Sequence, residues 1–543
     1  MSRTPIATLL AKLSVRPLVR FTVYLGLLFA LRWDCLDDPF FGDSLSYVMP
    51  TVFNQTDHGL ELYPIATREE GPGTDGGGHP FLFFHILALF LKLGLPPLAT
   101  THVITMLFAA LILCAVDRIA GVLAGNAAGF AAAGLVLVNP TFIAHAGLVM
   151  LEIPQTALTL LTLWAALTGR WGWCAAFCSL SVLVKEPAVW VLPPLGLYAL
   201  LVGERHGAIR RVVHVAIPGL VFAAWMVGCK LTTGLWINRP YTNWAYIGPM
   251  YRMTELFLND GRAALTLAAC GAVIWRVVRR RHLLHLFIMM GAAAAVMTGM
   301  PSLEGSIPSV RAALPWAAAG MAAMAGGVGT VWGSKGLLLL GALLMELVML
   351  TVLRETMPRY ALVSFALFPV IAVHAVWHVR CPAVRWGAVA LGVALAITAW
   401  NTPEASERNL RYREQLAGIQ QAASWLERHH PDSKVLWVPP YSLLDPRYGY
   451  VSVPLDAYQP ERQPRLLPPD TMPDLCLCIS IPPMTEADEK RCEARVRRLA
   501  EKFKARVTVE YVVDLPMIKV QLRGLRTDRL RDAGAPGRPR PDP

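Results

Sequence analysis

Charged residues are scarce in this chain of 543 residues: Asp, Glu, Lys and Arg together make up 16%, and the mean hydropathy is +0.44. Because soluble domains carry roughly 25% charged residues, this composition excludes an ordinary soluble protein and predicts a polytopic membrane protein. The sequence also lacks a G-x-x-x-x-G-K-S/T segment, which excludes a P-loop nucleotide-driven pump. It has no His and Cys residues at zinc-site spacing and no paired broken helices of the kind found in many secondary transporters.

The positions of the cysteines do not predict a set of disulfide bonds. Ten are scattered along the chain, and several lie inside apolar runs, where cysteine is an ordinary small core residue. Cys476, Cys478 and Cys492 lie in the C-terminal part, where the C-x-C spacing leaves both a disulfide and a metal site open. No small-residue cleavage site follows the first apolar run, so we predict a retained signal anchor with a cytoplasmic N-terminus.

Apolar runs recur through residues 17–400. The run 81–95 is short and ends near Lys92 and Pro96, so we expect it to lie at the membrane interface or to re-enter the membrane. A membrane-spanning helix needs about 20 residues, and on that basis the other runs predict about 13 transmembrane helices. These runs are 17–33, 99–116, 119–138, 153–169, 171–184, 187–202, 212–229, 263–278, 283–299, 312–332, 337–353, 361–379 and 385–400.

Basic residues gather in short loops between these runs, and such loops tend to face the cytoplasm. The loops are marked by Arg118, Arg170, 204–211, 276–281, Lys335, Arg380 and Arg385. All of them lie on one side if the run 81–95 does not cross the membrane. Several polar segments, none of which was used to assign the orientation, then lie together on the other side. Their grouping predicts a site on the extracytoplasmic face. These segments are 34–79, 139–152, 185–186, 230–262, 302–311 and 354–360.

The C-terminal part differs in composition from the rest. Residues 404–429 and 486–503 have helical patterns, and 434–438, 475–481, 507–513 and 517–522 have strand patterns. Such alternation predicts a small α/β domain. We therefore expect a transmembrane domain over 1–402, an extracytoplasmic α/β domain over 403–525, and a disordered tail over 526–543, which is rich in Arg, Pro, Gly and Asp.

The first extracytoplasmic loop, residues 34–80, is the strongest candidate for an active site. It begins with several aspartates, and carboxylates at a membrane surface tend to mark function. Asp43 and Tyr47 are four residues apart, so a helix would place both on one face, where they could hold a sugar hydroxyl, a phosphate or a metal. His79 follows three glycines, which allow close backbone approach to a ligand. The alternative is a hydrated interfacial loop with a flexible glycine hinge.

Other polar residues stand beside the predicted spans. Glu152 begins one of them, where the helix dipole favours a carboxylate, so capping is the alternative to catalysis. Lys185 and Glu186 separate two apolar runs, either as a solvated turn or as a phosphate site that uses the lysine. Basic residues also precede two later spans, as interfacial anchors or as phosphate contacts: Arg311, and Arg359 with Tyr360.

Taken in order, these motifs resemble the GT-C superfamily of polyprenyl-phosphate-dependent glycosyltransferases. The resemblance is to the branch that contains protein mannosyltransferases, aminoarabinose transferases and RgtA/B/C/D-like proteins, and it covers most of residues 15–400. Asp43-Ser44 stands where an Asp-Glu pair is usual, Glu152 where Asp is more common, and His79-Pro80-Phe81 where a double proline is usual. The matching motifs are the acidic-x-x-x-Tyr segment 42–47, the His-Pro segment 79–82, the acidic span start 151–154, the Lys-x-Pro turn 185–187 and the Arg-Tyr segment 358–360.

The resemblance implies a GT-C-like integral-membrane glycosyltransferase in a bacterial inner membrane. Such an enzyme transfers a hexose or pentose, with inversion, from a polyprenyl-phosphate donor to a lipid, glycan or protein on the extracytoplasmic face. It implies catalytic roles for Asp43 and Glu152, which could also hold a divalent cation, Mg²⁺ or Mn²⁺. No nucleotide, organic cofactor or nucleic acid is expected. The implied substrate-binding residues are Tyr47, His79, Lys185, Glu186, Arg311, Arg359 and Tyr360.

Two other classes of function stay open from the sequence. One is a non-catalytic membrane scaffold or a lipid or glycan transporter, and the other is an enzyme related to O-antigen ligases or polymerases. A transporter should place charged residues on both sides of the membrane midplane, whereas the unusual charges here fall on one side. The sequence does not specify the sugar, the acceptor, the prenyl length or the oligomeric state.

We predict the topology from the charge asymmetry of the loops. In a cysteine-free background, single cysteines at Asp75 and Asp445 should react with a membrane-impermeant thiol reagent in intact cells. Cysteines at Gly207 and Lys335 should react only after the membrane is opened. Labelling of positions 75 and 207 from the same side would contradict the extracytoplasmic site.

Overall fold

The computed structural model describes residues 17–60, 62, 79–203, 205–233, 333–346, 349, 358–401, 410, 412–429, 435–438, 475–480, 497, 501, 505–515 and 518–527. The predicted spans 263–278, 283–299 and 312–332 lie outside these residues, as do the glycines before His79. The count of about 13 spans therefore stays a prediction.

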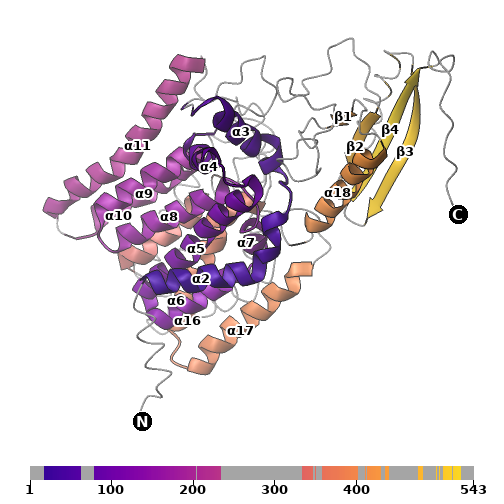
Figure 1. Cartoon of the computed structure of the whole chain (residues 1–543). Helices are drawn as coiled ribbons and strands as arrows, with labels where there is room; N and C mark the ends of the chain where they lie inside the picture. The colour runs from indigo at the N-terminus through magenta and orange to yellow at the C-terminus, as the bar shows by residue number, and fades with distance from the viewer. Residues whose placement is uncertain are drawn as a thin grey trace, which may run out of the picture.

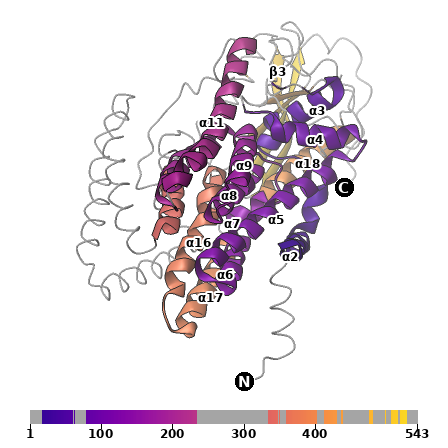
Figure 2. The ribbon, with the colours of Figure 1, turned by 90° about the vertical axis from the view of Figure 1, so that its left-hand side faces the viewer.

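A bundle of helices forms the main body of the protein (Figures 1 and 2). The helices α5, α8 and α16 lie at its centre, with α2 and α6 packed against α5, and α9 and α11 packed beyond α8. The helices are α2 (Pro17–Arg32), α4 (Leu82–Lys92), α5 (Pro97–Ala124), α6 (Asn126–Leu137), α7 (Pro140–His145), α8 (Glu152–Leu167), α9 (Trp171–Val184), α10 (Leu192–Leu201), α11 (Arg205–Thr233), 333–346, α16 (Leu362–Trp377) and α17 (Pro382–Thr398).

Three helices among the described residues are long and apolar enough to cross a membrane: Pro97–Ala124, Gly207–Thr232 and Arg359–Trp377. The chain is thus an integral membrane protein. Helix α4 has only 11 residues, which at 1.5 Å per residue give about 16 Å. This is roughly half of a hydrocarbon core of about 30 Å, in keeping with an α4 that does not span the membrane.

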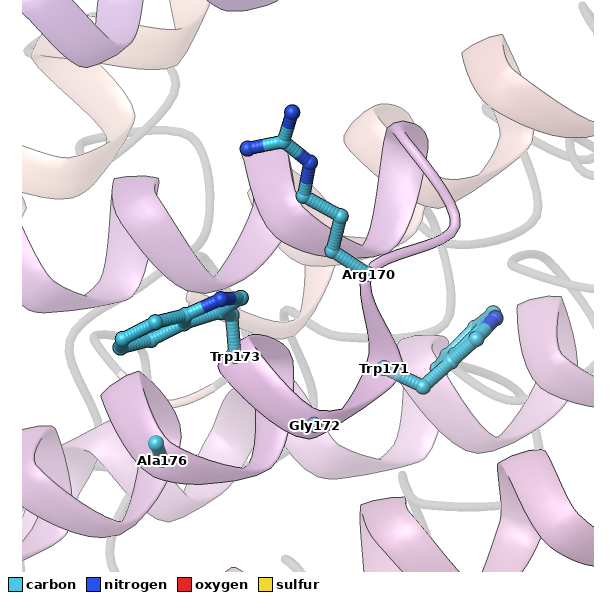
Figure 3. A pocket seen from close by; sticks show the side chains of 5 residues that line it. All are labelled: Arg170, Trp171, Gly172, Trp173 and Ala176. Atoms are coloured by element: carbon cyan, nitrogen blue, oxygen red, sulfur yellow. The ribbon is translucent and has the colours of Figure 1, made fainter.

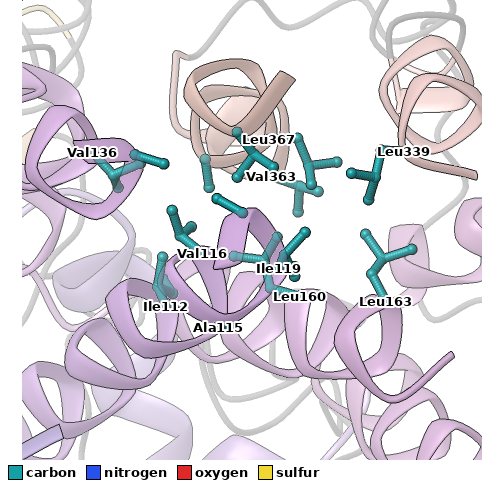
Figure 4. Packing of buried hydrophobic residues seen from close by; sticks show 14 of the residues in the cluster. Ile112, Ala115, Val116, Ile119, Val136, Leu160, Leu163, Leu339, Val363 and Leu367 are labelled. Carbon is teal, nitrogen blue, oxygen red and sulfur yellow. The ribbon is translucent and has the colours of Figure 1, made fainter. Parts of the chain in front are cut away.

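The centre of the bundle is packed with aliphatic side chains. Figure 4 shows Ile112, Val116 and Ile119 of α5 facing Leu160 and Leu163 of α8 and the leucine and valine side chains of α16. All of these side chains are less than 8% exposed. The polar side chains buried within these helices are mostly threonine and serine, such as Thr105, Thr159 and Thr162, whereas the buried charged residues other than Asp117 and Glu346 lie near helix ends.

The predicted break between spans 99–116 and 119–138 is wrong. Helix α5 continues through Arg118 to Ala124 and ends at Gly125, whose φ of 90° suits glycine. The helix can continue because Asp117 is neutralised: Arg20 of α2 donates to both of its carboxylate oxygens, at 2.6 and 2.5 Å. A buried charge that has such a partner does not need to sit in a loop.

The part of the first loop that is described up to Leu60 contains more regular structure than its polar sequence indicates. It contains a 3₁₀ turn, η1 (Trp33–Asp37), a π-helical turn, η2 (Ser44–Val48), and helix α3 (Met49–His58). Gly42 has a φ of 60° and directs the chain into η2. A second apolar cluster contains residues of α3, α4 and α18 (Tyr412–His429).

The predicted C-terminal strands form one sheet in the order β1-β2-β4-β3. β1 (Val435–Val438) is parallel to β2 (Leu475–Ser480), while β3 (Ala505–Leu515) and β4 (Ile518–Thr527) form an antiparallel pair. β4 includes the first two residues of the tail predicted as disordered, because they pair with the start of β3. The predicted helix starting at 404 is described only from Tyr412, and that over 486–503 lies almost wholly outside the described residues.

Replacing Gly129 by alanine should destabilise the protein. A Cβ at this position of α6 would lie 2.5 Å from the Asp117 carbonyl oxygen, and overpacking of this kind costs about 1–3 kcal/mol. Gly134 of the same helix has no atom within 4 Å of its added Cβ, so Gly134→Ala is the control. Thermal unfolding in detergent should show a lower Tm for Gly129→Ala alone; equal Tm values for both variants would contradict the close packing of α6 against Asp117.

Candidate active site

The motif residues gather where several helices begin. α4, α8 and α16 start at the same end of the bundle, and the short 3₁₀ helices η4 (Glu186–Val191) and η6 (Pro358–Ala361) precede α10 and α16. Proline accompanies each start, at positions 80, 154, 187 and 358. Proline suits the first turn of a helix because the amide hydrogens there have no partner within the helix. The prolines therefore help to fix the helix ends that carry the site.

Arg359 joins two carboxylates from distant parts of the chain. Its Nη2 donates to Asp43 Oδ2 at 2.7 Å, and its Nε lies 3.3 Å from Glu152 Oε1. Asp43 comes from the first loop, Glu152 begins α8, and Arg359 lies in η6. The guanidinium is a planar group with several donors, which suits it to bridging two acids.

Lys185 completes the pairing of Glu152. Its Nζ donates to Glu152 Oε1 at 2.6 Å and lies 4.5 Å from the centre of the Tyr360 ring, a cation–π geometry. Lys185 is only 2% exposed, so the alternative of a solvated turn is wrong. Burial alone would lower the pKa of Lys185, but the adjacent Glu152 carboxylate raises it above its ordinary value. Lys185 is thus charged at neutral pH.

A second group of contacts surrounds Asp43. The Tyr47 hydroxyl donates to Asp43 Oδ2 at 3.2 Å, as expected for residues on one face of a helical turn. The Tyr47 and His79 rings are 5.5 Å apart, and His79 Nδ1 lies 2.8 Å from Glu186 Oε2. Burial, followed by the charge of Asp43, raises the pKa of Tyr47 well above its ordinary range. In this arrangement the Tyr47 hydroxyl is a hydrogen-bond donor to Asp43.

Exposure distinguishes Asp43 from its partners. Its side chain is 23% exposed, whereas those of Arg359, Lys185 and Glu152 are 4%, 3% and 1% exposed. Glu152 Oε2 is buried and accepts no hydrogen bond from any of the described residues. The arrangement thus combines the partly exposed carboxylate of Asp43 with two buried cations, Arg359 and Lys185. Oε2 of Glu152 is a further acceptor close to these cations.

The structure brings together eight of the nine site residues predicted from the sequence: Asp43, Tyr47, His79, Glu152, Lys185, Glu186, Arg359 and Tyr360. The ninth, Arg311, lies outside the described residues. Sequence reasoning missed His145, a fully buried residue at the end of α7 that interacts electrostatically with Glu152. Its only sequence signal is its place in the polar segment 139–152.

The donor set does not fit a divalent cation in this arrangement. Asp43 and Glu152 both face Arg359, and Glu152 also faces Lys185, so a metal between the carboxylates would meet two positive charges. Within the described residues no group of three His, Cys, Asp or Glu is placed to hold a metal ion. The metal role suggested for Asp43 and Glu152 stays a prediction.

A surface cavity of about 640 Å³ lies away from this cluster (Figure 3). It is lined by Arg170, Trp171, Gly172, Trp173 and Ala176, at the start of α9, whereas Lys185 follows the end of the same helix. The 14 residues of α9 span about 21 Å at 1.5 Å per residue. The cavity therefore belongs to the opposite end of the α8–α9 hairpin and takes no part in the site.

The fold and site define the class as a multi-helical membrane protein with a buried ion-pair cluster at one end. No protein-family model and no curated protein matches the sequence. Two crystal structures of ArnT from Cupriavidus metallidurans resemble it with 13% identity over 92% of this chain and 97% of theirs. The apo form has a TM-score of 0.44, and the form bound to undecaprenyl phosphate has 0.45.

Glu152→Gln should destabilise the fold strongly. Removing one partner of a buried ion pair costs about 3–5 kcal/mol, because Lys185 would be left buried beside a neutral amide. Glu346→Gln is the matched control: Glu346 is also buried, and its hydrogen-bond partners in the described part of the chain are neutral, namely the Ser364 hydroxyl and the backbone of Val363 and Ser364. That change should cost about 1 kcal/mol. Thermal unfolding of both variants tests this, and an equal loss of Tm would contradict the charge pairing of Glu152.

Proposed function

We propose that the protein transfers a sugar from a polyprenyl-phosphate donor to an acceptor hydroxyl on the extracytoplasmic face of a bacterial inner membrane. One observation carries this proposal: the partly exposed Asp43 lies 2.7 Å from a buried Arg359, and Lys185 and Arg359 both approach Oε1 of Glu152. A carboxylate that can take up a proton thus stands next to cations that can stabilise a phosphate.

The donor phosphate would bind at Arg359 and Lys185. The leaving polyprenyl phosphate gains negative charge as the bond between the anomeric carbon and the phosphate oxygen breaks, and fixed cations stabilise charge that develops in a transition state. Both cations are already fixed by Glu152 and need little reorganisation. The apolar helix faces beside the site would hold the prenyl chain, so no nucleotide sugar or organic cofactor is required.

Asp43 would act as the general base. The acceptor hydroxyl attacks the anomeric carbon from the face opposite the phosphate, its proton passes to Asp43, and the electron pair of the broken bond leaves on the phosphate. One displacement of this kind inverts the anomeric centre. The Tyr47 hydroxyl and Arg359 both donate to Oδ2 of Asp43 and so fix the position of the carboxylate, and a catalytic base needs such a fixed position.

Glu152, Glu186 and His79 would orient the sugar and the cations. Glu152 fixes Lys185 and keeps Oε2 available as an acceptor for a sugar hydroxyl. The His79–Glu186 pair closes the site on the side of α4 and places the His79 ring against Tyr47. In this proposal the carboxylates are ion-pair partners and not metal ligands, so transfer should persist in the presence of EDTA.

Asp43→Asn tests the proposal most directly. The change keeps the size of the side chain but removes its basicity, and loss of a general base typically costs about 10²–10⁴-fold in rate. We expect the variant to make at least about a hundredfold less product. Mass spectra of surface glycans from cells with and without the protein identify the product, and its amount per protein is then compared between variants.

The controls separate catalysis from binding. Asp37 lies in the same loop and is exposed, so Asp37→Asn should transfer normally. Asp34 and Asp38 are unsuitable, because both pair with Arg413. Purified Asp43→Asn should still bind undecaprenyl phosphate, whereas Lys185→Gln should bind it about tenfold or more weakly, since a charged hydrogen bond contributes about 1.5–3 kcal/mol. Normal transfer by Asp43→Asn and no glycan difference between the cells would indicate a scaffold or transporter instead.

A further inference from the structure

We infer that helix α18, in the C-terminal extramembrane part of the chain, is a positioning element of the active site, and that Arg413 and Tyr412 set the location of Asp43. This inference rests on the function proposed above. Figure 1 shows α17 leading away from the bundle towards α18, beside the strands. Yet the first turn of α18 contacts the segment 32–41, which directly precedes Asp43.

Arg413 holds the beginning of this segment through two aspartates. Its guanidinium forms an ion pair with Asp34 and another with Asp38, the latter with 3.1 Å between Nη2 and Oδ1. Nη2 also donates to the Asp34 carbonyl oxygen at 3.3 Å. One side chain thus contacts both ends of the η1 turn. An isolated exposed ion pair contributes little, but three contacts from one guanidinium define an orientation.

Tyr412 holds the same segment from its buried side. The Arg32 side chain, only 1% exposed, donates from Nη2 to the Tyr412 hydroxyl at 2.5 Å. The Tyr412 ring lies 5.7 Å from that of Phe41, two residues before Asp43. Tyr412 is fully buried in the apolar cluster that α18 shares with α3 and α4. The position of Phe41 therefore depends on α18.

The Asp43 segment is tied at the same time to the chain that leads to Glu152. Arg32 Nη1 donates to the carbonyl oxygens of Ile143 and Ala144, and Ser44 Oγ donates to that of Val149 at 2.7 Å. Gly147 leaves room for this arrangement, because a Cβ there would lie 2.6 Å from Arg32 Cζ. The segments that carry Asp43 and Glu152 are thus hydrogen-bonded to each other. The first residue of α18, Tyr412, contacts Arg32, one of the side chains that join them.

Loss of the α18 contacts should move Asp43 without removing any group that touches substrate. Misplacement of a catalytic group by about 1 Å can cost on the order of 100-fold in rate. Binding of the donor phosphate would depend on Lys185 and Arg359, whereas the α18 contacts described above are to the segment 32–41. The expected signature is therefore slower transfer with unchanged donor binding.

The experiment compares full-length Arg413→Gln and Tyr412→Phe with wild type, using the cell-surface product and the purified protein's affinity for undecaprenyl phosphate. Arg413→Gln should lower product formation about tenfold or more, while the affinity stays within about twofold. Arg413→Lys should recover part of the loss. Arg428→Gln is the matched control, since Arg428 lies at the far end of α18 and donates to a carbonyl of its own helix.

The outcomes separate this inference from the proposed function. If Arg413→Gln and Tyr412→Phe both transfer at the wild-type rate while Asp43→Asn is inactive, the positioning role is wrong and the proposed function stands. If Arg428→Gln is impaired as much as Arg413→Gln, or if affinity falls in parallel with transfer, α18 contributes only to folding and the inference is overturned. Should Arg413→Gln fail to fold, Asp34→Asn removes the same ion pair from the other side and should give the same selective loss.

Discussion

The structure around the site depends on the need to pair buried charge. Arg359 and Lys185 are almost completely buried, and both meet Glu152, which is itself 1% exposed. An unpaired charge in such surroundings costs several kcal/mol, so these residues must approach one another whenever the helices pack. Arg359 lies in η6, Lys185 precedes η4 and Glu152 begins α8. The site therefore forms at the same time as these helices pack together at this end of the bundle. Asp43 adds the first loop to the same network.

Helix ends explain how a largely apolar protein can hold so many polar groups. The interiors of α5, α8 and α16 form the apolar core (Figure 4), and polar side chains there are few. At the helix starts the backbone amides have no partners within the helix and carry a partial positive charge, which favours Glu152 and Glu186 at these positions. The proline in each motif sets the backbone for such a start. Several motifs therefore place a charged side chain at a helix start, where the backbone stabilises it, and the site forms where these helix starts lie together.

The sequence predicts the site better than it predicts the contacts that hold it. The motif residues stand in the polar segments between apolar runs or at the edges of those runs, so hydropathy and charge asymmetry predict that they share one side of the membrane, and eight of them lie at one end of the bundle. The break assigned at Arg118 was wrong because Asp117 is neutralised by Arg20, 97 residues away. Arg413 pairs with Asp34 over 379 residues, and His145 reaches Glu152 through the fold of α7. Contacts of this kind leave no local pattern, since each residue alone looks like an ordinary surface or core position.

The division into a catalytic transmembrane domain and an appended C-terminal domain does not describe how Asp43 is held. Asp43 is the most exposed ionised group of the main cluster, and its segment contains only short 3₁₀ and π-helical turns, which are too small to fix their own position. The order of this segment must come from its neighbours, and these are the 143–149 segment on one side and α18 on the other. Asp43, the side chain most accessible to a substrate, is thus also the one whose position depends on α18, which lies more than 360 residues further along the chain. Any movement of α18 relative to the bundle would therefore be transmitted to Asp43 before it affected the buried cations.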